Sequence, residues 1–194
     1  MSLPRPLPPP EKLLDAYARG LFPMAHHDGR VYWHDPDPRA IFPLQDLRPN
    51  ARLKRFVRNE GYTCTIDRCF TAVMEGCADR PTTWITPGMI SVYGTLHRMG
   101  HAHSVETWRD DVLIGGIYGV SIGTAFFGES MFSHAPNASK AAFHMLAAHL
   151  QQRGFTLFDT QYINDHTRML GALEIPREHF RVLLADALRR PNCF

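Results

Sequence analysis

The longest hydrophobic stretch of the chain, residues 113–133, consists of two runs of β-branched and aromatic residues. A short segment at 121–124, which contains a glycine, separates the two runs, a pattern typical of strands joined by a tight turn. The second run is almost wholly apolar except for Glu129. Burying a carboxylate without a partner costs on the order of several kcal/mol. The pattern therefore predicts a central β-hairpin in which Glu129 faces a cleft or a cation.

Several other segments carry the periodicity and the end signals of helices and strands. Gly20 and Gly154 end two amphipathic runs, because glycine suits the position that follows a helix. Thr86 is a good N-cap before Pro87, which favours the first helical position. We predict helices over residues 11–19, 69–78, 87–99, 138–153 and 176–189, and further strands over 62–67, 101–109 and 156–163.

This order of elements predicts an α+β fold with a mixed, mostly antiparallel sheet and helices on both faces. The order resembles the fold of GCN5-related acetyltransferases. We expect a small N-terminal subdomain at 1–47, made of a Pro-rich lead-in, a short helix and a Pro-Asp-Pro loop, and a catalytic domain at 48–194. Acetyltransferases of that kind hold pyrophosphate in a glycine-rich turn before the long helix. The corresponding turn here, 133–138, has no glycine and contains Pro136, which argues against acetyl-CoA.

Composition limits the classes of protein to consider. The chain of 194 residues has room for one sizeable core, and its net charge of +2 indicates no particular partner. Its apolar runs are far shorter than the roughly 20 residues that span a bilayer. A proline-rich start in place of an apolar segment indicates no signal peptide. The four cysteines show no paired spacing, so we expect reduced thiols and a cytoplasmic location.

Residues 48–58 carry five basic side chains and no acid. On a helix, Arg48, Arg52 and Arg55 would form one stripe, with Lys54 and Arg58 beside it. A solvated helix face is the ordinary explanation of such a stripe. The missing acids favour phosphate binding equally well. The sequence leaves both explanations open.

The strand predicted at 156–163 contains an unusual polar pair. Alternation places Asp159 and Gln161 on one face of an otherwise apolar strand. The polar cluster Asn164-Asp165-His166 follows directly. A structural polar pair would also explain Asp159 and Gln161. Together with Glu129, however, these residues predict a polar cleft at one edge of an apolar sheet, as in many catalytic sites.

Six ordered motifs resemble the leucyl/phenylalanyl-tRNA–protein transferase family over roughly residues 13–185. They are Leu14-x-x-Tyr17-x-x-Gly20-x-Phe22-Pro23, Asp35-Pro36-Asp37-Pro38-Arg39, Thr83-Trp84-Ile85-Thr86, Gly100-His101-Ala102-His103-Ser104-Val105-Glu106, Gly128-Glu129-Ser130-Met131-Phe132-Ser133 and Asp159-x-Gln161-x-x-Asn164-Asp165-His166. The chain departs from the family in a shorter lead-in. Met24 and His34-Asp35 also replace the family's usual Trp and Trp-Ser, which thins an aromatic wall near the donor adenosine.

The resemblance implies a reaction. A Leu, Phe or Met residue moves from the 3′ end of its tRNA to the α-amine of a protein that begins with Arg or Lys. The product enters the N-degron degradation route. It implies tRNA and acceptor proteins as partners, no cofactor or metal, a cytoplasmic location and a monomer. The ester is already activated and an α-amine has a pKa near 8, so positioning should matter more than a strong base.

The resemblance also implies roles for individual residues. Asp159 would orient Gln161, whose carboxamide oxygen would hold the attacking amine. Glu129, Trp33, Trp84 and Ser133 would lie by the 3′-terminal aminoacyl-adenosine, with the two tryptophans as stacking platforms. The donor side chain would enter a pocket made by Ile117, Met131, Phe143, Leu146 and Leu150, although ordinary core would explain each of these singly. The phosphates of the acceptor stem would lie on Arg52, Lys54, Arg55 and Arg58.

Three other readings compete with this one. Eleven histidines, above all His101-x-His103 on one strand face and His26-His27, suggest a metal site, but no carboxylate or cysteine lies at a fixed ligand offset. An acetyl-CoA-dependent N-acetyltransferase is the second reading. A non-catalytic RNA-binding module is the third, and it leaves Asp159, Gln161 and Glu129 unexplained. Asn137-Ala138-Ser139 matches a glycosylation sequon, but we interpret it as a helix N-terminus.

Overall fold

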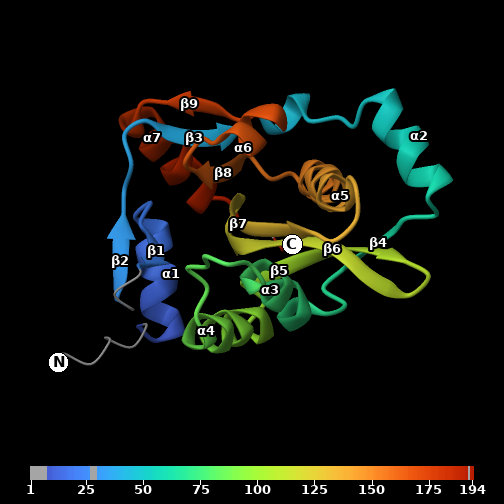
Figure 1. Cartoon of the computed structure of the whole chain (residues 1–194). Coiled ribbons are helices and arrows are strands. Elements are labelled where there is room, and N and C mark those ends of the chain that lie inside the picture. Colours follow the sequence, from blue (N-terminus) through green and yellow to red (C-terminus); the bar gives the residue numbers. More distant parts are fainter. Residues whose placement is uncertain (1–7, 27–29, 192) are drawn as a thin grey trace.

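A mixed sheet runs through the molecule (Figure 1). The computed structural model describes residues 8–26, 30–191 and 193–194, so part of the proline-rich lead-in and His27 lie outside the described residues. Within them the sheet has seven strands in the order β4-β5-β6-β7-β8-β3-β9. Their bounds are β3 Arg39–Phe42, β4 Thr63–Ile66, β5 Ala102–Arg109, β6 Val112–Ile122, β7 Ala125–Ser133, β8 Leu157–Gln161 and β9 Leu173–Ile175.

All neighbouring strands of this sheet are antiparallel except β7 and β8, which run parallel. The predicted hairpin is confirmed: β6 and β7 pair along their length and turn at Gly123 and Thr124. The turn is tight because Gly123 has φ +56, and a Cβ there would lie 2.5 Å from the carbonyl oxygen of Ala187. Glycine tolerates this conformation and this close approach.

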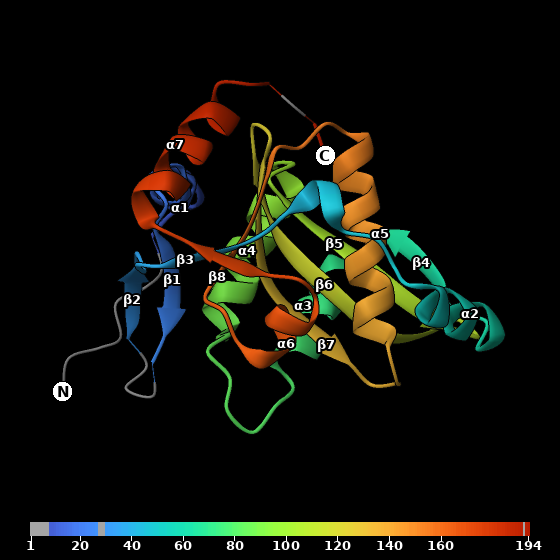
Figure 2. The same ribbon diagram turned by 90° about the horizontal axis from the view of Figure 1, so that it is seen from above.

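Helices cover both faces of the sheet (Figures 1 and 2). Helix α5 (Ala138–Gln152) buries Phe143, Leu146 and Leu150 against one face. The other face packs against α1 (Pro10–Ala18), α3 (Phe70–Ala78), α4 (Pro87–Arg98) and α7 (Arg177–Leu188). Helices α2 (Ala51–Asn59) and α6 (Asp165–Met169) and the 3-10 helix η1 (Leu44–Asp46) complete the order. The predicted α+β fold with helices on both faces is thus confirmed.

The first part of the chain contributes to two sheets. Strands β1 (Phe22–Ala25) and β2 (Val31–His34) form a separate antiparallel hairpin. Strand β3 instead inserts between β8 and β9 in the large sheet. A division of the chain at residue 47 stays a prediction, but part of segment 1–47 belongs to the main sheet. Among the described residues, no helix is long and apolar enough to cross a membrane.

Two predicted elements differ in ways that matter for the site. Helix α2 begins at Ala51, because the side chain of Asn50 accepts a hydrogen bond from the backbone N–H of Leu53 and caps the helix. Arg48 therefore precedes the helix and is not part of its basic stripe. Strand β8 ends at Gln161, two residues earlier than predicted, because Gln161 has φ +66. A positive φ leaves the extended conformation that a strand requires.

Candidate active site

A cavity of about 630 Å³ opens where the parallel strands β7 and β8 separate. The two strands pair only as far as Phe127 and Asp159, and beyond that point they diverge. The walls come from the separating strands, from α6, from the segment between α3 and α4, and from β1. Its polar lining includes Asp79, Arg80, Glu129, Ser130, Ser133, His134, Ser139, Thr160, Gln161, Tyr162, Asn164, His166 and Thr167. The diverging strands thus produce the polar cleft that the sequence predicts.

Glu129 lies at the centre of a hydrogen-bond chain beside this cavity. Its Oε1 accepts hydrogen bonds from the Tyr17 hydroxyl at 2.8 Å and from the Gln161 side-chain amide at 2.9 Å. The Tyr17 hydroxyl is also 2.5 Å from that of Tyr93. Tyr17 on α1 and Tyr93 on α4 are fully buried, whereas Glu129 is half-buried and lines the cavity. Two distant segments, α1 and β8, therefore hold one oxygen of this carboxyl group, and α4 supports the Tyr17 hydroxyl.

The surroundings of Glu129 favour its uncharged form. Burial raises the pKa of its carboxyl group to about 8, and the nearby charge of Asp159 acts in the same direction. The hydrogen bonds from Tyr17 and Gln161 favour the ionised form and lower the pKa of Glu129, but they do not outweigh burial. Burial also raises the pKa of Tyr17 and of Tyr93 well above the usual value, so both hydroxyls keep their protons.

Asp159 forms a buried ion pair with Arg39. The Arg39 Nε donates to Oδ1 at 2.8 Å and Nη2 donates to Oδ2 at 2.6 Å, and neither side chain has exposed surface. Arg39 Nη1 donates to the carbonyl oxygen of Gly20, and the guanidinium lies over the rings of Phe22 and Phe180. Asp159 does not line the cavity. The prediction that it faces the cleft beside Gln161 is therefore wrong, because Arg39 from β3 covers it.

Asp159 nevertheless contacts Gln161 through the backbone. Its Oδ1 accepts a hydrogen bond at 3.0 Å from the backbone N–H of Gln161, the residue with φ +66. A left-handed conformation at a non-glycine residue costs about 1–2 kcal/mol, and such strain occurs mainly at functional sites. The bond to Asp159 and the side-chain bond to Glu129 together fix Gln161 at the cavity wall. Asp159 thus positions Gln161, and its predicted part in catalysis stays a prediction.

Family models and relatives agree on one family. The model described as leucyl/phenylalanyl-tRNA protein transferase matches residues 41–185, and the model of the N-terminal domain of the same family matches 8–37. The leucyl/phenylalanyl-tRNA–protein transferase of Ruegeria pomeroyi is 51% identical over 182 residues, covering 93% of this chain and 87% of the relative. That of Gloeobacter violaceus is 48% identical over 186 residues, covering 95% and 96%. The chain belongs to the leucyl/phenylalanyl-tRNA–protein transferase family.

Solved structures show a weaker likeness. The structure of L-PGS from Bacillus licheniformis aligns over 80% of this chain and 51% of that chain, with a TM-score of 0.44 and 12% identity. A match at this level says nothing about the site. The membership of the transferase family therefore rests on the sequence relatives and the family models.

The residues that the resemblance places near the donor adenosine lie in different surroundings. Glu129, Trp84 and Ser133 line the cavity. The Ser133 hydroxyl also accepts a hydrogen bond from the backbone N–H of Ser139 at the start of α5. Trp33 does not line the cavity and is 42% exposed, although its strand partner Pro23 does line it. The structure thus brings together three of these four residues.

The predicted donor side-chain pocket is only partly assembled. Ile117 and Met131 line the cavity. Phe143, Leu146 and Leu150 are buried in the core between α5 and the sheet and do not line it, so their part in a donor side-chain pocket stays a prediction. Phe42 and Phe158 line the cavity instead, and the ring of each packs against Phe143. They separate Phe143 from the cavity, whereas Ser139 at the start of α5 lines it.

The four cations assigned to phosphate lie on the outer surface of α2. Arg52, Lys54, Arg55 and Arg58 are all exposed. No other described residue forms an ion pair with any of them. The opposite face of α2 packs its apolar side chains beside Tyr62, whose hydroxyl donates to the carbonyl oxygen of Pro136. Helix α2 is thereby anchored to the segment 133–138 that borders the cavity.

Sequence reasoning missed Arg39, Tyr17 and Tyr93 as parts of the site. Arg39 ends the Asp35–Arg39 motif, but the sequence gives no reason to place it in the site. Its local signal is a cation at the start of an apolar strand. Tyr17 and Tyr93 look like ordinary apolar positions of helices. No local pattern reveals that their hydroxyls meet beside Glu129.

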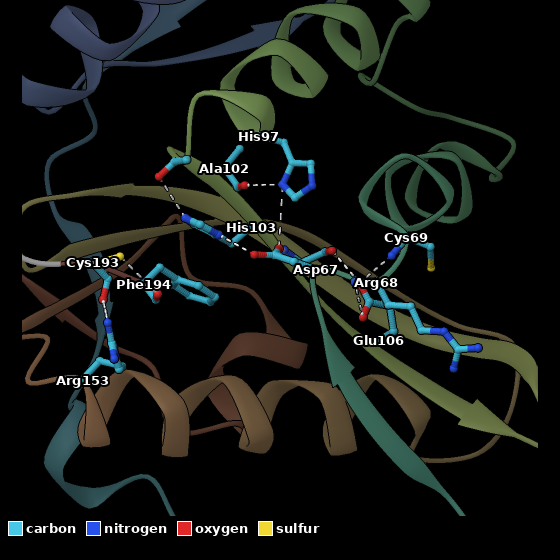
Figure 3. A network of polar contacts seen from close by, with 12 residues as sticks. Asp67, Arg68, Cys69, His97, Ala102, His103, Glu106, Arg153, Cys193 and Phe194 are labelled. Atoms are coloured by element: carbon cyan, nitrogen blue, oxygen red, sulfur yellow. Dashed lines mark hydrogen bonds and ion pairs between the residues drawn. The ribbon is translucent and has the colours of Figure 1, made fainter.

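A second polar cluster lies away from the cavity (Figure 3). Asp67, His97 and His103 have ligand atoms within 4.8 Å of one another, a geometry that the sequence reading of His101-x-His103 missed. His103 contacts Asp67 through Nδ1 and the carbonyl oxygen of Gly100 through Nε2, and His97 Nδ1 contacts the carbonyl oxygen of Ala102. A nitrogen that donates to a carbonyl has no lone pair for a metal. As arranged here, the cluster is a hydrogen-bond network that joins α4 to β5.

Proposed function

We propose that this protein transfers a leucyl, phenylalanyl or methionyl group from aminoacyl-tRNA to the α-amine of a protein that begins with Arg or Lys. The new N-terminal residue would mark the acceptor for N-degron degradation. The names of the relatives support the donor classes Leu and Phe. The observation that carries the proposal is the fixed carboxamide of Gln161 at the wall of a cavity.

The orientation of that carboxamide follows from its neighbours. Glu129 Oε1 accepts a hydrogen bond from Tyr17, so Gln161 meets the same oxygen with its Nε2. The carbonyl oxygen of the Gln161 amide is then left for a donor in the cavity. An α-amine is such a donor, and a fixed acceptor can hold it against an activated ester. Placing two reactants in this way contributes about 7–11 kcal/mol in favourable cases.

The apolar part of the cavity suits an unbranched apolar donor residue. Ile117, Met131, Phe42 and Phe158 supply apolar walls close to Gly128 and Glu129. A Cβ at Gly128 would lie 3.1 Å from the Phe158 ring, so this part of the wall is tightly packed. Trp84 lines the cavity from the segment before α4 and offers a face on which a terminal adenine can stack.

The basic surface of α2 suits the acceptor stem of the tRNA. Its four exposed cations pair with no acid in the described part of the chain, and the helix is anchored to the segment that borders the cavity. Contacts with phosphates would position the tRNA without reading its sequence. We also infer a monomer, which is supported by a site assembled from the strands and helices of a single chain. We infer a cytoplasmic location as well, which is supported by the free thiols of Cys64, Cys69 and Cys77.

A direct transfer assay tests the proposal. Purified protein is incubated with leucyl-tRNA carrying radiolabelled Leu and with matched peptides that begin with Arg, Lys or Ala. We expect label in the Arg and Lys peptides and none in the Ala peptide. Two control donors replace leucyl-tRNA in separate reactions: free Leu mixed with deacylated tRNA, and acetyl-CoA. Neither should give a product. Acetylation without leucyl transfer would instead support an N-acetyltransferase.

A further inference from the structure

The two oxygens of Glu129 have different surroundings. Oε1 accepts from two donors, Tyr17 and Gln161, so both of its lone pairs are engaged. The bonds from Tyr17 and Gln161 both end on Oε1, and the Tyr93 hydroxyl also lies within hydrogen-bonding reach of the carboxyl group. In the uncharged acid the proton therefore resides on Oε2. Because Glu129 lines the cavity, this O–H group is accessible to a bound molecule.

The hydroxyl chain keeps this arrangement in place. The Tyr17 hydroxyl donates to Glu129, so the contact between Tyr17 and Tyr93 requires that Tyr93 donates to Tyr17. The proton of Tyr17 then points toward Oε1 and the proton of Tyr93 toward Tyr17. Both tyrosines are fully buried on separate helices, so neither ring has room to turn away. Glu129 keeps its own proton at the cavity, where substrate would be.

We propose that Glu129 is the proton shuttle of aminoacyl transfer and that Tyr17 and Tyr93 are its positioning residues. The inference rests on the proposed function, because it assigns a step of that reaction. The neutral α-amine attacks the ester carbonyl, and a C–N bond forms while the C–O bond to the 3′ oxygen breaks. Oε2–H gives its proton to the departing 3′ oxygen. The proton that the new amide nitrogen loses then returns to the Glu129 carboxylate, which restores the acid.

This role differs from that of a strong base. The α-amine has a pKa near 8, so part of it is already neutral at pH 7. The departing 3′ oxygen needs a proton more than the amine needs a base, because an alkoxide is a poor leaving group until it is protonated. General acid catalysis of this kind typically contributes 10²–10⁴-fold. An acid with a pKa close to the working pH suits both halves of the shuttle.

The groups around Glu129 decide how its titration responds to mutation. Tyr17 on α1, Tyr93 on α4, Asp159 and Gln161 on β8 and Arg39 on β3 all act on it or on its partners. Tyr17 stabilises the carboxylate by donating to it, so its loss raises the pKa of Glu129. Tyr118 has a buried hydroxyl that forms a hydrogen bond with none of the described residues, although it lies in the same cluster. It is therefore a matched control.

The test measures single-turnover transfer of Leu to an Arg-initiated peptide from pH 6 to 9.5. The wild-type profile should rise as the amine deprotonates and fall again near pH 8 as Glu129 ionises. Tyr17→Phe should move the falling limb up by at least half a pH unit, and Tyr93→Phe should move it in the same direction. Tyr118→Phe should leave the limb in place. Glu129→Gln should abolish the falling limb and lower turnover at least 100-fold, with donor KM within threefold of wild type.

A second measurement is independent of activity. Carbon-13 NMR of side-chain carboxyl groups in the substrate-free protein should show a Glu129 resonance that titrates near pH 8 and shifts upward in Tyr17→Phe. Turnover of Glu129→Gln within threefold of wild type, or an unmoved falling limb in Tyr17→Phe, would overturn the shuttle. A wild-type protein that transfers no amino acid would instead reject the proposed function, while the NMR titration would still report the state of Glu129.

Discussion

Arg39 and Asp159 are 120 positions apart in the sequence and form a fully buried, two-bond ion pair where β3 meets β8. The pair fixes the end of β8, and Asp159 then fixes the backbone of Gln161. Removing one partner of a buried pair leaves an uncompensated charge, which is far more damaging than losing a surface pair. The cavity wall therefore depends on an interaction that no substrate touches.

Asp159→Asn should consequently destabilise the protein. The variant keeps the size of the side chain but leaves the Arg39 guanidinium buried without its counter-charge. We expect the free energy of unfolding to fall by about 3–5 kcal/mol. Urea denaturation checks this, with Glu178→Gln as control, because that glutamate forms only an exposed pair with Arg181. A loss below about 1 kcal/mol would show that Asp159 is not the structural partner described here.

Trp84→Ala should weaken binding of an aminoacyl-adenosine analogue by roughly 1–3 kcal/mol, because the indole lines the cavity and would stack on the base. Trp33→Ala should weaken it less, because that side chain lies outside the cavity lining. Calorimetric titration of both variants gives the comparison. An unchanged affinity in Trp84→Ala, together with a lower melting temperature, would make Trp84 a core residue.

Neutralising two cations of α2, Arg52→Gln with Lys54→Gln, should raise the KM for aminoacyl-tRNA and leave turnover at saturation unchanged. Each lost phosphate contact should flatten the slope of log K against log salt by roughly 0.7–0.9. The control is Arg189→Gln with Arg190→Gln, two exposed cations directly after α7 that already pair with Asp186. Equal slopes in wild type and the α2 variant would restore the solvated-surface explanation.

The raised pKa of Glu129 makes stability depend on pH in a defined direction. Burial raises that pKa to about 8 from an ordinary value of 4.5, so between these values the folded protein retains a proton that the unfolded chain has released. The contribution of Glu129 to the free energy of unfolding is fully present below pH 4.5 and is lost as the pH rises through 8. Urea midpoints from pH 5 to 8 should fall more in wild type than in Glu129→Gln. Parallel curves would show that Glu129 is ionised in the fold.

Local pattern predicts much of the fold. The apolar runs on either side of Gly123 predict the β6–β7 hairpin, and Thr86 with Pro87 predicts the start of α4. These signals work because turn and cap preferences depend on neighbouring residues alone. Strand β3 is different, since four residues without alternation give no sign that they pair with β8. Its insertion depends on contacts that are distant in sequence.

The same limit applies to the site. Glu129 and Gln161 stand out because a polar side chain in an apolar strand needs an explanation. Phe143 and Leu146 have the same apolar character as Ile117, so the sequence alone does not separate core from cavity wall. The tyrosine hydroxyls that reach Glu129 come from helices that a pattern shows only as buried. Such residues are found by geometry.

The most direct test of the central claim, that transfer takes place at the Gln161–Glu129 wall, is the turnover of Gln161→Ala with leucyl-tRNA and an Arg-initiated peptide. The change removes the bond to Glu129 and the acceptor proposed for the amine. Gln152→Ala is the control, because that glutamine is exposed at the end of α5. We predict that turnover falls roughly 100-fold or more in Gln161→Ala, the effect of misplacing one reactant, and stays at the wild-type value in the control. Near-normal turnover in Gln161→Ala, in a variant that remains folded, would contradict the account.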